Sequence, residues 1–66
     1  MELDRRLKEL RLRRGLTQEQ AAQVLGVSAQ VVSKWERGLT QPDVQMMPRI
    51  AVLYRISLDE LYDIYA

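Results

Sequence analysis

The chain has 66 residues, of which 47% are hydrophobic, and its ten Lys and Arg residues nearly balance nine Asp and Glu residues. This length allows one small domain at most (residues 1–66), which buries only about 60% of the surface that its unfolded chain exposes. Cysteine and histidine are absent, which excludes disulfides, thiolate chemistry and metal sites built on imidazole or sulfur. Without a signal peptide or an apolar run near the roughly 20 residues of a membrane span, we expect a cytoplasmic protein with no metal, cofactor or membrane contact.

Charge is distributed unevenly along the chain, although the net charge is only +1. Residues 1–38 hold eight basic and five acidic residues, a balance of +3, whereas residues 39–66 hold two basic and four acidic residues, a balance of −2. Such an asymmetry bears on the partners of a protein rather than on its fold. The basic N-terminal half therefore favours a nucleic-acid partner more than the net charge does.

An amphipathic helix is predicted over about residues 3–14. Leucines spaced i, i+4 and i+7 begin at Leu3 and continue to Leu10, with Leu12 as a further candidate for the buried stripe. Basic residues fill the last turn, and Gly15 follows directly. Glycine just past a helix end and cations in its last turn are both typical of a helix C-terminus.

The next predicted helix spans residues 18–25. Thr17 suits the N-cap position, and Gln20 three residues later completes a capping box. Two alanines and Leu25 form the side that we expect to be buried, and alanine allows another helix to approach closely. Gly26 ends the helix, since glycine adopts a left-handed conformation at little cost.

A third helix is predicted from Ser28 to Arg37, so that a helix-turn-helix unit occupies about residues 17–38. Ser28 is its N-cap, and the residue before it forms a hydrophobic staple with Val32. Val32 and Trp35 face the interior. Glycine follows the helix, and the composition of residues 39–43 predicts a loop.

Proline restricts where the fourth helix begins. Pro48 lacks an N–H and is tolerated only in a first turn, so we expect the helix to start between Val44 and Met46 and to end near Tyr54. Its side chains expected to be buried are Met47, Ile50, Ala51, Leu53 and Tyr54.

Ser57 and Glu60 form a second capping box, which predicts a fifth helix over about residues 58–64. No segment shows the strict alternation of a half-buried strand. Five short helices joined by short loops predict a compact all-α bundle.

The central stretch has the residue types that a helix-turn-helix requires at fixed positions. In a twenty-residue window that starts at Gln18, the fifth position is Ala22, the ninth is Gly26, the fifteenth is Val32 and the eighteenth is Trp35. The fifth residue must be small because the second helix of the unit crosses it. The ninth must allow a sharp turn, and the last two must anchor the second helix in the core.

One face of the predicted helix at 28–37 is polar. At 3.6 residues per turn, Gln30, Ser33, Lys34 and Arg37 lie within an arc of roughly 100°, and Ala29 borders it. The major groove of DNA admits one α-helix. Glutamine pairs there with adenine, lysine with guanine, and an alanine methyl group contacts thymine. The same side chains also fit an ordinary solvated helix surface.

Four residues are candidates for contacts with the DNA backbone. Gln18 begins a helix whose positive end suits a phosphate, and its side chain offers a further hydrogen bond. Ser28 fits either a cap alone or a cap that also touches phosphate. Arg37 ends the polar helix beside the expected backbone, and Arg14 fits either a phosphate contact or a charge cluster at a helix end.

The motifs stand in a fixed order that covers nearly the whole chain: Arg11–Gln18, Ala22, Leu25–Ser28, Val32–Gly38, Pro42–Asp43 and Ile56–Leu61. In this order they resemble the Cro/C1-type helix-turn-helix family, also called the XRE family, of phage repressors and bacterial regulators. The resemblance implies a lambda-repressor-like fold of five helices, double-stranded DNA as the ligand, and a third helix that reads its bases. It also implies two-fold homodimers on pseudo-palindromic operators.

The resemblance further assigns roles to single residues. It implies that Gln18 contacts phosphate and that Ala29, Gln30, Ser33 and Lys34 lie nearest the base edges. Arg11 and Glu36 match the positions of the family's buried ion pair between the first and third helices. Arg55 stands where the family often has glycine, which costs about 1–2 kcal/mol if the backbone there is left-handed.

Two hypotheses from different classes follow. The first is a sequence-specific regulator of transcription, a repressor, that binds as a dimer through the loop at 39–44 and the segment 62–65, although this segment also fits a fraying terminus. The second is an adaptor or antitoxin-like module that uses the same fold to bind a protein partner. Affinity for duplex DNA that falls steeply with salt separates them. No enzymatic constellation of acid, base and nucleophile is present, and no small-molecule ligand is evident.

Overall fold

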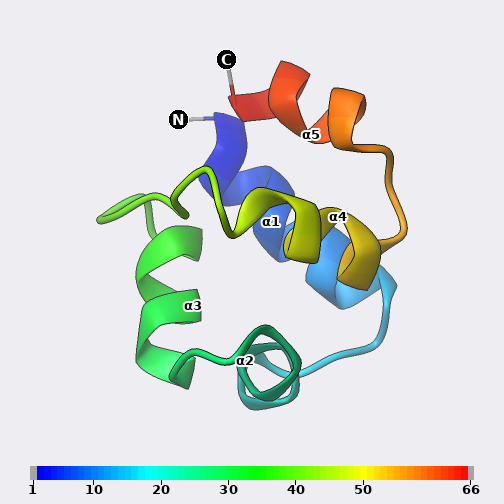
Figure 1. Cartoon of the computed structure of the whole chain (residues 1–66). Coiled ribbons are helices and arrows are strands. Elements are labelled where there is room, and N and C mark those ends of the chain that lie inside the picture. Colours follow the sequence, from blue (N-terminus) through cyan, green and yellow to red (C-terminus); the bar gives the residue numbers. More distant parts are fainter. Residues whose placement is uncertain (1, 66) are drawn as a thin grey trace.

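The computed structural model describes residues 2–65, which form five helices without a strand (Figure 1). The bundle is compact, with extents of 25 × 23 × 21 Å. This architecture confirms the predicted all-α bundle. The helices are α1 (Glu2–Arg13), α2 (Gln18–Leu25), α3 (Ala29–Glu36), α4 (Met47–Tyr54) and α5 (Leu58–Tyr65).

The leucine stripe of α1 is buried as predicted, with one change at its C-terminal end. Leu3, Leu7 and Leu10 are buried, whereas Leu12 is 57% exposed. The buried position at this end belongs to Arg11 instead. A charged side chain is buried in a small domain only when it is paired, and the partner of Arg11 lies on α3.

The turn between α2 and α3 follows from local signals in the sequence. The hydroxyl of Thr17 accepts from the backbone N–H of Gln20 at 3.0 Å, and the Gln20 side chain accepts from the Thr17 N–H at 2.9 Å. Gly26 has φ 75°, a left-handed C-cap that ends α2. The Ser28 hydroxyl accepts from the N–H of Val31 and caps α3. The predicted capping box, glycine stop and serine cap are therefore confirmed.

Helix α4 begins later than predicted, at Met47 rather than between Val44 and Met46. Residues 44–46 form a separate turn, in which the N–H of Met46 donates to both the carbonyl and a carboxylate oxygen of Asp43, each at 3.0 Å. Pro48 has no N–H to bond back to this turn, so the helical pattern starts with the N–H of Ile50.

Helix α5 is capped by Ser57, whose hydroxyl accepts from the N–H of Glu60 at 3.0 Å. The predicted capping box is only half formed. The Glu60 carboxylate accepts from the Ser57 hydroxyl rather than from the Ser57 backbone N–H. Between α4 and α5, Arg55 is left-handed, with φ 57° and ψ 44°. It is the one non-glycine residue with positive φ in the described chain.

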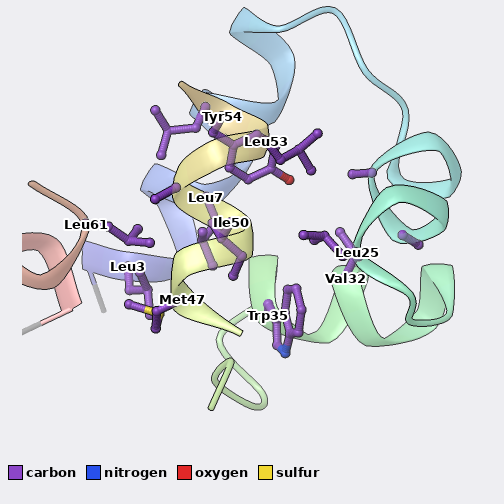
Figure 2. Close-up of a cluster of buried hydrophobic side chains, with 14 residues drawn as sticks. Leu3, Leu7, Leu25, Val32, Trp35, Met47, Ile50, Leu53, Tyr54 and Leu61 are labelled. Atoms are coloured by element: carbon purple, nitrogen blue, oxygen red, sulfur yellow. The ribbon is translucent and has the colours of Figure 1, made fainter. Parts of the chain in front are cut away.

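The core gathers side chains from all five helices around α4 (Figure 2). Val32 and Trp35 project into it from α3, with exposures of 1% and 7%. Because both anchors are buried, α3 has one fixed face and one free face. The buried hydrophobic side chains are Leu3, Leu7, Leu10, Ala21, Ala22, Leu25, Val32, Trp35, Met47, Ile50, Ala51, Leu53, Tyr54 and Leu61.

Candidate nucleic-acid interface

The free face of α3 presents two long polar side chains. Gln30 and Lys34 are exposed, and neither side chain makes a hydrogen bond or an ion pair within residues 2–65. They lie one turn apart on a helix whose opposite face is held by buried Val32 and Trp35. This arrangement leaves both side chains available to a ligand while it fixes the backbone that carries them.

Ser33 and Arg37 are joined on the same face. The Arg37 Nε donates to the Ser33 hydroxyl oxygen at 3.2 Å, so the serine retains its own hydrogen for a further bond. The spacing of four residues could have predicted this contact, since side chains at i and i+4 are neighbours on a helix. Ala29 is half-buried at the N-terminal end of α3.

A buried ion pair connects α1 to α3. The Arg11 Nε lies 2.7 Å from one oxygen of Glu36 and its Nη2 lies 3.0 Å from the other, and the two side chains are only 8% and 3% exposed. The remaining Nη1 donates to the Leu16 carbonyl at 2.8 Å. The hydrogen bonds to Glu36 raise the pKa of Arg11 more than burial lowers it, so the guanidinium stays charged.

Gln18 belongs to the same network, which the sequence did not reveal. Its Nε2 donates to Glu36 at 3.1 Å, across 18 residues of chain. The backbone N–H groups of Gln18 and Glu19 make no hydrogen bond within the described chain. These groups are directed out of the N-terminus of α2, where the helix dipole favours an anion.

An open hollow is lined by residues from the start of α2 and the start of α3. Gln18 and Ala29 both line it, so a predicted phosphate contact and a predicted base contact share one site. Exposed Leu12 also lines this hollow, which the sequence did not predict. The complete lining is Arg11, Leu12, Gly15, Leu16, Thr17, Gln18, Glu19 and Ala29.

Two further predicted contact residues have internal partners. The Ser28 hydroxyl accepts from the Val31 N–H at 3.3 Å and keeps its hydrogen available. The Arg14 Nε donates to the Leu53 carbonyl at 3.0 Å, near the C-terminus of α4. The structure therefore places Ser28 at the N-terminus of α3, whereas it ties Arg14 to α4.

Within residues 2–65, no group of three or more His, Cys, Asp or Glu side chains is placed to hold a metal ion. No helix in this part of the chain is both long enough and apolar enough to cross a bilayer.

A family model described as "Helix-turn-helix" (HTH_3) matches residues 7–61, most of the chain. The chain belongs to the Cro/C1-type helix-turn-helix family. It is 39% identical over 61 residues to the HTH-type transcriptional activator BcrR of Enterococcus faecalis, covering 92% of this chain and 30% of the relative. It is 38% identical over 61 residues to the HTH-type transcriptional regulator ImmR of Bacillus subtilis, covering 92% of this chain and 48% of the relative.

The same fold occurs in the P22 c2 repressor protein, solved in complex with a synthetic operator. The TM-score is 0.84 at 24% identity, with 92% of each chain covered. This helix-turn-helix chain spans about half the length of ImmR and less than a third of BcrR. The match therefore concerns the helix-turn-helix part of those relatives.

Proposed function

We propose that this protein binds double-stranded DNA in a sequence-specific manner and regulates transcription. The observation that carries the proposal is the free face of α3, where exposed Gln30 and Lys34 have no partner in the described chain and stand on a buried base. The major groove of B-DNA admits a helix of this kind. Membership of a family whose relatives carry the names of transcriptional regulators supports it.

Specificity would come from four side chains. Gln30 would bond to adenine and Lys34 to guanine, while the methyl group of Ala29 would contact thymine. Ser33 would donate its hydroxyl hydrogen, which the bond from Arg37 leaves free, to a base acceptor. With a single methyl group at Ala29, most of the discrimination would rest on the glutamine and the lysine.

Affinity would come from the phosphates that flank the groove. Gln18 would bind one through the free N–H groups at the start of α2, with its side chain held in place by Glu36. Ser28 and Arg37 would contact the backbone at the two ends of α3. Arg14 would contribute only through its η nitrogens, since its Nε is bonded to α4.

A homodimer on a pseudo-palindromic operator would place two α3 helices in successive major grooves about 34 Å apart. The proposed contact surface includes Leu39 and Val44, which are 63% and 66% exposed, and Tyr62, which is 36% exposed. The side chain of Tyr65 lies outside the described residues. We assign repression in the cytoplasm, because a dimer seated on an operator occupies DNA that RNA polymerase would need.

Binding to a duplex selected from a random library tests the proposal. Gln30→Ala and Lys34→Ala should each weaken binding to the selected sequence by about 1–3 kcal/mol while they change nonspecific binding little. Arg37→Ala should weaken both and reduce the salt dependence by about one phosphate contact. Gln23→Ala, an exposed change on α2, serves as the control.

Two results would contradict these assignments. An equal loss on all sequences would mean that Gln30 and Lys34 touch only phosphate. No detectable duplex binding at low salt would instead favour an adaptor that uses the fold to bind protein.

A further inference from the structure

An apolar hollow lies between α2 and α4, which pack against each other. Val24 of α2 and Val52 of α4 border it and are 65% and 80% exposed. Leu25 and Leu53 form its buried floor. Pro48 and Arg49 complete the lining.

The two valines contribute little to the fold. Side chains that are more than half exposed bury little apolar area, and valine is a weaker helix former than the alanine, glutamine or lysine that an exposed site accepts. Single exposed apolar residues are common, but two that face one apolar hollow from neighbouring helices form a continuous patch. Apolar patches rimmed by polar groups occur at protein interaction sites.

The single charged residue in the lining of the hollow is positive. Arg49 is exposed and makes no hydrogen bond or ion pair within the described residues. No acidic residue lines the hollow. An occupant that complements this surface therefore combines apolar side chains with carboxylates.

The hollow is separate from the proposed DNA contacts and dimer segments. Val24 lies near the C-terminus of α2, about 9 Å along the helix from Gln18. None of its lining residues belongs to α3, to the loop at 39–44 or to the segment 62–65. It would stay open on a protein bound to DNA.

We propose that this hollow docks an acidic amphipathic helix of a protein partner. Two apolar side chains one turn apart would cover Val24 and Val52, and a carboxylate on the flank of the same helix would pair with Arg49. A helix laid in a groove is a common mode of peptide recognition. The exposed valines leave the hollow too open to enclose a small molecule, whose binding requires most of its surface to be buried. Docking of such a helix does not require DNA binding.

A titration of the ¹⁵N-labelled protein with synthetic helical peptides tests this proposal. The probe carries leucines at i and i+4 with flanking glutamates, and its twin carries lysines in place of the glutamates. We expect the acidic probe to shift the amide signals of Val24, Arg49 and Val52 in a saturable way, with and without duplex DNA. The lysine twin should bind at least about fivefold more weakly.

Matched variants separate the apolar contribution from the charge. Val24→Ser with Val52→Ser should lower affinity for the acidic probe by about tenfold or more, since each valine would be buried in the complex. Arg49→Gln should lower it by about two- to fivefold, as expected for a pair at an exposed rim. Leu58→Ser, an apolar-to-serine change at an exposed site that does not line the hollow, should have no effect.

Three outcomes would overturn the proposal. They are no saturable shift at millimolar acidic probe, equal binding of the lysine twin, and shifts at α2 and α4 that depend on protein concentration without peptide. The last would mean that a second copy of this chain occupies the hollow. Thermal unfolding of each variant checks that it remains folded. If the protein failed to bind duplex DNA, the expected peptide binding at the hollow would be unchanged.

Discussion

Removing the Glu36 carboxylate should strongly destabilise the protein. In the Glu36→Ala variant, Arg11 loses bonds of 2.7 and 3.0 Å and keeps only its bond to the Leu16 carbonyl, while its side chain is 8% exposed. Gln18 loses its acceptor as well. An uncompensated buried charge typically costs about 3–5 kcal/mol. A domain of this size has an unfolding free energy of about 3–10 kcal/mol, so the loss takes a large part of the total.

Equilibrium unfolding in urea measures this loss, with the fluorescence of the single, buried Trp35 as the probe. An osmolyte restores the native baseline if the variant is partly unfolded without denaturant. The control is Glu2→Ala, which breaks a 3.0 Å pair with Arg5 whose side chains are 59% and 70% exposed. That change should cost less than about 1 kcal/mol because solvent screens the pair.

A double variant distinguishes pairing from packing. Arg11→Met combined with Glu36→Leu replaces both charges by apolar side chains, so the penalty of an unpaired buried charge disappears. We expect this variant to be at least about 2 kcal/mol more stable than Glu36→Ala. Two results would refute the reasoning. One is a cost for Glu36→Ala no larger than that for Glu2→Ala. The other is a double variant whose loss of stability equals the sum of the losses of Arg11→Met and Glu36→Leu measured singly.

Three further predictions concern the backbone and pH. Burial raises the pKa of Tyr54 to about 12, so the neutral phenol stabilises the fold below pH 10 and this contribution, on the order of 3 kcal/mol at most, is lost between pH 10 and 12. Tyr54→Phe should reduce the slope of stability against pH in that range, and an unchanged slope in urea unfolding would contradict the assignment. Arg55→Gly should stabilise by about 0.5–1 kcal/mol because φ is 57°, whereas Arg55→Ala keeps the strain and should bring no gain in the urea midpoint. Gly38→Ala should destabilise by at least about 1 kcal/mol, since φ is 74° and the new Cβ would lie 2.6 Å from an Asp4 carboxylate oxygen. Asp4→Ala in the same chain should relieve the contact but not the backbone strain, and complete rescue of the melting temperature would show that strain is unimportant.

Local signals in the sequence located the helix-turn-helix almost to the residue. Thr17, Gly26 and Ser28 cap helix ends through contacts with backbone groups within one turn of themselves. The helix boundaries they set can therefore be predicted without knowledge of the fold. The start of α4 was predicted too early because Pro48 limits a helix without fixing its first residue. Asp43 held the missing signal, since its carboxylate accepts from the N–H three residues later.

Contacts between side chains far apart in the sequence were harder to predict. The bond from Arg14 to the Leu53 carbonyl spans 39 residues, and the bond from Gln18 to Glu36 spans 18. Neither contact has a period or a motif of its own, because it exists only once the helices have packed. The ion pair of Arg11 and Glu36 was predicted only through the resemblance to the family.

The position of Glu36 explains why a buried carboxylate suits this fold. It belongs to α3, yet it binds Arg11 of α1 and Gln18 of α2. The apolar contacts of Val32 and Trp35 hold α3 against the core but, being non-directional, tolerate small rotations about its axis. Bonds with defined donors and angles limit such rotations, which would otherwise move Gln30 and Lys34 relative to the start of α2. The spacing between the proposed base and phosphate contacts is thus set by a polar contact rather than by packing alone.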